Sequence, residues 1–164
     1  MKAIAIAIVV ALAASPLAHA KEGPDALFVM KAGQAGLAEV ALGNDANSLG
    51  KNESVKHFGQ RMATDHTAAN GKLASAARAG AYDVPGEPSV EQKAAELKLK
   101  ALDSAAFDKA YASQMVKDHE EAVALFEKES SAGKDASLKA FATETLPTLK
   151  EHLKMAQDLQ AAVK

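Results

Sequence analysis

Three histidines and one glutamate are the residues of this sequence best suited to chemistry, because each lies on the apolar stripe of a different predicted helix. Imidazole nitrogens and carboxylate oxygens are ligands for zinc, iron, manganese and cupric copper. A free coordination position would allow water activation or oxygen chemistry. The four residues are Glu39, His66, His119 and His152.

Burying four such groups without partners costs several kcal/mol. Three explanations follow from the pattern. The groups bind one transition-metal ion, or they form a mutually hydrogen-bonded Glu–His network in the core, or the helical-wheel placement is wrong and they are exposed. Metal binding is the leading hypothesis.

Two of the histidines end the same motif, Met-x-x-Asp-His. In each copy an aromatic residue, a Met and the His follow at four-residue spacing, so they share one helix face. Met62 and Met115 are accessory ligand candidates that would favour copper, although a Met on an apolar stripe is usually a packing residue. Asp65 and Asp118 lie about 100° from their histidines, so we expect them to face neighbouring helices or solvent, with support of a histidine as the alternative. The copies occupy residues 62–66 and 115–119.

Apolar residues at three- and four-residue spacing predict the helices that position these groups. Asn52 or Ser54, Ser89, and Asp103 or Ser104 are the expected N-terminal caps, and Gly80 is an expected C-terminal cap. Pro147 predicts a kink in the last helix. Four long helices are expected at 25–49, 53–79, 104–131 and from 136 onward, and a short one at 89–101.

The connections decide how these helices pack. Short turns at 45–52 and 133–135 and one long connection at 81–88 predict an all-α four-helix bundle, with the short helix in the crossover between the second and third long helices. No strand pattern competes. If both turns lie at the same end, the four titratable groups fall in one layer about 10 Å thick. The helix order around the bundle is left open.

The first twenty residues carry the features of a secretory signal peptide: a basic start, a short apolar run and an Ala-His-Ala ending. We therefore expect cleavage after Ala20, export to the periplasm and a single mature domain at 21–164. The chain has no Cys, so neither a lipid anchor nor a disulfide is expected. Charges interrupt every later helix-length window, and no transmembrane segment is predicted in the mature chain.

Charge and motifs exclude several function classes. The predicted mature chain has 18 basic and 21 acidic residues, which argues against nucleic-acid binding. No nucleophile elbow or Gly-rich phosphate loop is present, so no nucleotide cofactor is expected and enzymatic turnover is not the favoured hypothesis. The rival hypothesis is a metal-free stress or interaction protein that uses residues 81–104 or an outer helix face. The protein partner, and whether the chain forms a homo-oligomer, are left open.

Four separated motifs begin at Phe28-Val29, Val55-Lys56-His57-Phe58, Phe107-Asp108 and Leu146-Pro147-Thr148-Leu149. Taken in order, they resemble an exported bacterial family, the domain of unknown function 4142. The resemblance covers nearly all of residues 25–160 and implies a ferritin-like helical bundle without a settled activity. Di-iron members of the ferritin-like group use Glu-x-x-His on two helices. Here the residues three before the histidines are Ala63, Val116 and Leu149, so a single-metal or metal-free site is expected instead.

Overall fold

The protein is all-helical over the residues that the computed structural model describes, 21–163, and these residues contain no strand. The predicted signal peptide lies outside this range. Long stretches rich in Ala, Leu, Glu and Lys favour helix, and the predicted helices are all present. They are α1 (Pro24–Leu49), α2 (Glu53–Ala79), α3 (Val90–Lys100), α4 (Ser104–Ala132) and α5 (Ala136–Ala162).

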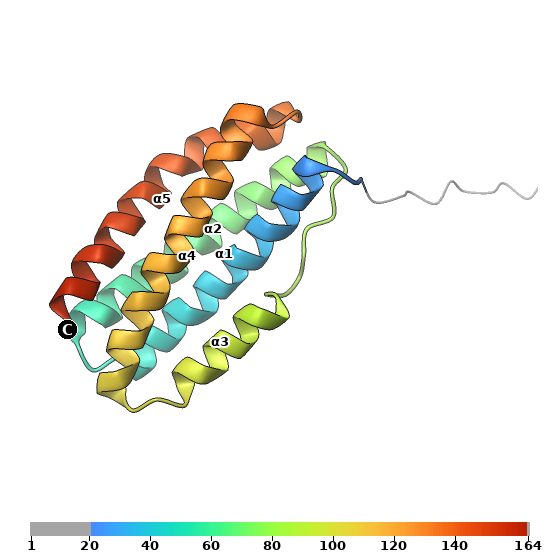
Figure 1. Ribbon diagram of the computed structural model, residues 1–164. Helices are drawn as coiled ribbons and strands as arrows, with labels where there is room; N and C mark the ends of the chain where they lie inside the picture. Colours follow the sequence, from blue (N-terminus) through green and yellow to red (C-terminus); the bar gives the residue numbers. More distant parts are fainter. Residues whose placement is uncertain (1–20, 164) are drawn as a thin grey trace, which may run out of the picture.

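The four long helices lie side by side, and α3 packs along the outside of α1 and α4 (Figure 1). α1 packs against α2 and α4, and α5 packs against the same two helices. This fixes the order around the structure as α1, α2, α5, α4, which the sequence left open. α1 and α5 are therefore diagonal to each other, as are α2 and α4.

Two aspartates show that the two tight turns lie at opposite ends of the molecule. Asp25, at the start of α1, accepts hydrogen bonds from the backbone N–H groups of Lys134 and Asp135 at 3.2 and 2.8 Å. Asp108, near the start of α4, accepts them from Lys51 and Asn52 at 3.0 and 2.8 Å. The condition under which the single layer was derived, both turns at one end, is therefore not met (Figure 1).

The four titratable groups nevertheless share one level. Measured from the end that holds residues 50–52, they lie about 15 to 22 Å along their helices at 1.5 Å per residue. Each is near the middle of a helix of similar length, so reversing one hairpin hardly changes its height. The reversal makes diagonal helices parallel, and α2 and α4 therefore carry the two copies of Met-x-x-Asp-His in the same direction.

Local sequence accounts for most helix ends. The side chains of Asn52, Ser89 and Asp103 accept hydrogen bonds from first-turn backbone N–H groups, as predicted. The predicted loop at 45–52 is too long, because α1 continues to Leu49. α5 runs through Pro147 without interruption.

Gly80 is the C-terminal cap of α2, as predicted, but it does not take the left-handed conformation common for a glycine there. Gly80 has φ −91°, and the following Ala81 takes the left-handed conformation at φ 55°. Glycine is required at position 80 because a Cβ there would lie 2.6 Å from a carboxylate oxygen of Asp135 and would also clash with the Tyr82 ring.

The core consists of two apolar clusters on either side of the titratable level. Along α2, Phe58 and Met62 of the first cluster precede His66, and Leu73 of the second cluster follows it. A close α1–α2 contact supports the first cluster, since a Cβ on Gly43 would lie 2.5 Å from a backbone oxygen of α2. The core is therefore interrupted by one polar level.

Within residues 21–163, none of the helices combines the length and the apolar character that crossing a bilayer requires.

Candidate metal centre

Three histidines from three helices meet in the centre of the molecule. The ring centroids of His66, His119 and His152 are 5.5 to 5.6 Å apart, close to an equilateral triangle. One nitrogen of each ring lies within 4.8 Å of the other two. The residues are 8, 1 and 1% exposed, which rules out the expectation of solvent-exposed side chains.

The His119 ring is oriented by its own helix. Its Nδ1 lies 2.9 Å from the backbone carbonyl oxygen of Met115, which can only accept a hydrogen bond. Nδ1 therefore carries the proton, and the lone pair is on Nε2. That Nε2 is buried and has no hydrogen-bond partner.

The His152 ring is oriented from a neighbouring helix in the opposite sense. Its Nε2 lies 2.9 Å from Oδ2 of Asp65, which leaves the lone pair on Nδ1, a buried atom without a partner. Arg61 holds the same Asp65 oxygen at 3.2 Å and also contacts Glu151 at 3.0 Å. Asp65 thus supports a histidine, which is the alternative that the sequence left open.

Burial keeps all three imidazoles neutral near pH 7. It lowers the pKa of His66 to about 3 and that of His119 to about 4, in both cases with a contribution from the neighbouring imidazoles. Burial also lowers the pKa of His152, although the hydrogen bond to Asp65 opposes this shift. His66 Nε2, like the two atoms above, is buried without a partner. Three neutral rings therefore offer three lone pairs.

Glu39 lies beside the triangle and not within it. Its Oε1 is 3.7 Å from His119 Nδ1, too far for a hydrogen bond, and its Oε2 is buried without a partner. Burial, followed by the charge of Asp118, raises its pKa well above the ordinary value. Among the described residues no hydrogen bond joins any two of the four groups, which argues against the predicted Glu–His network.

A family model described as "Domain of unknown function (DUF4142)" matches residues 11–159. The chain belongs to this family. The four matched motifs that suggested the resemblance all fall inside that range. No curated protein and no solved structure matches the chain.

The two methionines of the repeated motif lie in an apolar part of the core. Met62 and Met115 are fully buried in the first apolar cluster, with Phe58 and Tyr111. The contact from Met115 to His119 is made by its backbone oxygen. Packing therefore accounts for both side chains.

A small cavity lies beside the histidine triangle. Its volume is about 40 Å³, enough for a water molecule. Glu39, His66, Asp118 and His119 contribute to its wall, together with apolar side chains such as Leu73. A ligand or water there would sit next to two of the three converging rings.

The nitrogen triangle is close in size to a formed metal site. If its sides are at most 4.8 Å, its centre lies within about 2.8 Å of each corner, whereas zinc–nitrogen bonds are about 2.0–2.1 Å. An inward movement of at most about 0.7 Å by each ring would close the difference. Rotation about the side-chain torsions supplies shifts of that size.

The sequence indicated Asp65 only as an alternative support for a histidine, and it did not identify His152 as the ring that Asp65 holds. The available signal for Asp65 was its i, i+4 spacing from Arg61, which indicates an ion pair on one helix. Nothing in the sequence indicated that α5 would bring His152 within 2.9 Å of that carboxylate.

Proposed function

We propose that this protein binds one transition-metal ion in a ferritin-like four-helix core, through His66, His119 and His152 with Glu39 as an additional carboxylate. We further propose that it is exported to the periplasm, where it serves metal handling or oxidative-stress protection. The amino-terminal signal-peptide pattern supports export. Turnover of a substrate is not part of the proposal.

One observation carries this proposal. Three neighbouring buried rings each have a nitrogen without a hydrogen-bond partner, and one nitrogen of each ring lies within 4.8 Å of one nitrogen of the other two. The second nitrogens of His119 and His152 are hydrogen-bonded to Met115 and Asp65. Metal-binding histidines usually donate their second N–H to a carboxylate or a backbone carbonyl in this way.

The donor set narrows the metal. Three neutral imidazoles suit zinc, copper, iron and nickel, whereas manganese prefers oxygen ligands. Met62 and Met115 pack in an apolar cluster, and thioether ligation is not part of the proposal. Zinc and cupric copper are therefore the first ions to test, followed by ferrous iron.

The deciding experiment is metal analysis of residues 21–164, purified from the periplasm without an affinity His tag. We expect about one equivalent of metal by elemental mass spectrometry, bound as isolated or after addition of Zn²⁺ or Cu²⁺. Circular dichroism checks the helical fold of each variant. Absence of metal as isolated, together with no binding on titration, would reject the proposal.

Matched substitutions assign the site. His66→Ala combined with His119→Ala is expected to abolish stoichiometric binding. His57→Ala is the control, because His57 lies on the same helix as His66 but is exposed. Equal loss of binding in the control would show that the metal is held at the surface.

A second candidate function has its own observation. The crossover region between α2 and α4 exposes four large apolar side chains, at 38 to 80% of their full surface. Several large exposed apolar side chains within one segment suit an interaction site, which fits a metal-free protein that associates through this region with a second copy of itself. The residues are Val84, Val90, Leu97 and Leu102.

Sedimentation velocity tests this second function. Val90→Ser combined with Leu97→Ser should convert a dimer to a monomer if the region mediates self-association. A wild-type chain that is monomeric at high concentration would reject it.

A further inference from the structure

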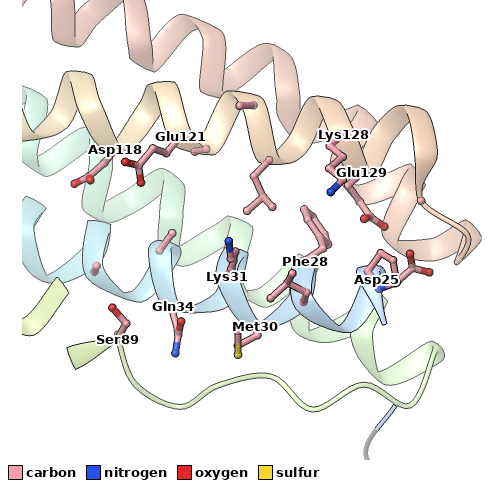
Figure 2. A pocket seen from close by; sticks show the side chains of 18 of the residues that line it. Asp25, Phe28, Met30, Lys31, Gln34, Ser89, Asp118, Glu121, Lys128 and Glu129 are labelled. Atoms are coloured by element: carbon pink, nitrogen blue, oxygen red, sulfur yellow. The ribbon is translucent and has the colours of Figure 1, made fainter. Parts of the chain in front are cut away.

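A surface groove of about 900 Å³ runs along the α1–α4 face and is bounded on one side by residues at the start of α3. Figure 2 shows Asp118 and Glu121 on the α4 wall, with Gln34 and Ser89 on the opposite side. Six acidic residues and only two lysines line the groove, so it attracts cations. The acidic residues are Asp25, Glu39, Glu91, Asp118, Glu121 and Glu129, and the lysines are Lys31 and Lys128.

The inner wall of this groove is also a wall of the small cavity beside the histidines. Four residues line both spaces: Ala35 and Glu39 from α1, and Asp118 and Ala122 from α4. The two alanines leave little bulk between the spaces, and the two carboxylates supply charge. Surface groove and inner cavity are thus separated by a single layer of side chains.

Glu39 is the group in this layer that packing does not explain. It is 5% exposed, and its Oε2 has no hydrogen-bond partner. Asp118 is partly buried, and its hydrogen bonds come from a neutral side chain, the amide of Gln114, at 2.8 and 3.0 Å. A buried carboxylate and a partly buried one beside it, neither in an ion pair with a Lys or Arg, are costly in a structural role, and a passing cation would offset that cost.

The opposite side of the triangle is less suited to cation passage. There, between α2 and α5, the Arg61 guanidinium binds Asp65 and Glu151 at 3.2 and 3.0 Å. Both of these carboxylates already have a cationic partner in Arg61, whose guanidinium binds the same Asp65 oxygen that contacts His152. Among the described residues, the groove carboxylates Glu39 and Asp118 make no ion pair with a Lys or Arg, and they are therefore the ones available to a cation.

We propose that divalent metal cations reach the histidine triangle through the α1–α4 groove, passing between Ala35 and Ala122 with Asp118 and Glu39 as successive carboxylate contacts. This inference rests on the proposed metal-binding function. It assigns Asp118 a role in the rate of loading and leaves the final coordination to the histidines.

The test measures rates and equilibrium separately on metal-free residues 21–164. Co²⁺ loading is followed by stopped-flow absorption, Co²⁺ release by transfer to excess chelator, and Zn²⁺ affinity by competition with a chromogenic chelator. Asp118→Asn should slow both association and release about tenfold and leave the affinity within about threefold. Ala35→Leu should slow both rates by narrowing the passage.

A matched control separates local from overall charge. Glu120→Gln removes the same charge from an exposed position of the same helix that lines neither space, and it should load at the wild-type rate. Higher salt should slow the wild type and Glu120→Gln, and affect Asp118→Asn less.

The outcomes distinguish the two proposals. A wild-type chain that binds neither Co²⁺ nor Zn²⁺ rejects the metal-binding function itself. Normal binding with wild-type loading rates in both Asp118→Asn and Ala35→Leu rejects only the access route. Weakened Zn²⁺ affinity in Asp118→Asn with an accelerated release would also reject it, because Asp118 would then be a ligand.

Discussion

Asp65 and Asp118 occupy the same place in two copies of one motif, on two parallel helices, and their partners differ. Asp65 accepts a hydrogen bond from the His152 ring and pairs with Arg61. Asp118 accepts from the Gln114 amide and lies near Glu39 at the groove. The difference arises on two helices. Four residues before the aspartate, α2 carries Arg61 and α4 carries Gln114, and on the adjacent helix α5 presents an imidazole to α2 whereas α1 presents a carboxyl to α4.

The two environments shift the pKa values of the two carboxyl groups in opposite directions. Burial alone raises the pKa of Asp65, but its hydrogen bonds with His152 and Arg61 outweigh burial and lower that pKa overall. Burial raises the pKa of Asp118, and the hydrogen bond from Gln114 offsets it only in part. A repeated motif thus produces one charged support for a ring and one carboxyl that is held less readily as an anion.

The largest effect is expected from acid, which protonates the buried histidine rings and so changes the free energy of unfolding. His66 and His119 have folded pKa values of about 3 and 4, below an unfolded value of 6.5. Their neutral forms stabilise the fold fully above pH 6.5, and this contribution is lost as pH falls toward those values. The raised pKa values of Glu39 and Asp118 oppose part of the loss, because those groups stabilise the fold more as pH falls.

Urea unfolding of the metal-free protein at pH 6.5, 5.5 and 4.5 measures the balance. Two imidazoles outweigh the carboxyls, and we expect a net loss of about 2 to 3 kcal/mol over this range. In the His66→Ala and His119→Ala double variant the loss should largely disappear. A wild type whose stability changes with pH in the same way as that of the double variant would mean that the rings are not buried in their neutral forms.

Asp65→Asn is expected to produce the next largest effect. The amide keeps the shape but loses the charge that fixes the His152 tautomer, and loss of such a support weakens metal affinity about 10- to 100-fold. Competition titration with Zn²⁺ measures the change. Glu151→Gln, which removes only the exposed outer partner of Arg61, should change the affinity less than threefold. Equal affinities for wild type and Asp65→Asn would show that His152 is not a ligand.

The fold was predictable because it depends on local signals. Each of these signals spans only a few positions of the sequence. They are the periodicity of the apolar stripes, cap residues such as Asn52 and Asp103, and the break at residues 81–88. The relative direction of the two hairpins was not predictable in that way. It depends on Asp25 and Asp108, whose partners are more than 50 positions away in the chain.

In the candidate site, too, the features that follow from local sequence were predictable and those that depend on packing were not. Helical phase alone placed His66, His119 and His152 inward, and their mid-helix positions kept them level whichever way the hairpins ran. Phase could not show that Glu39 lies beside the rings instead of among them, because a few ångströms of side-chain placement depend on packing. The partner of Asp65 likewise depends on helix order, which no local pattern encodes.

The smallest expected effect is on the free energy of unfolding of the metal-free protein. Replacing the two aspartates by asparagine should change it in opposite directions. Asp65→Asn removes charge-assisted hydrogen bonds to His152 and Arg61 and should destabilise the fold by about 1 kcal/mol at pH 7.5. Asp118→Asn removes a carboxyl whose raised pKa makes its anion unfavourable at that pH, and its amide oxygen still accepts from Gln114. It should therefore be neutral or stabilising by about 0.5 kcal/mol. Urea midpoints that fall equally in both variants would show that the two copies of the motif serve the same structural purpose.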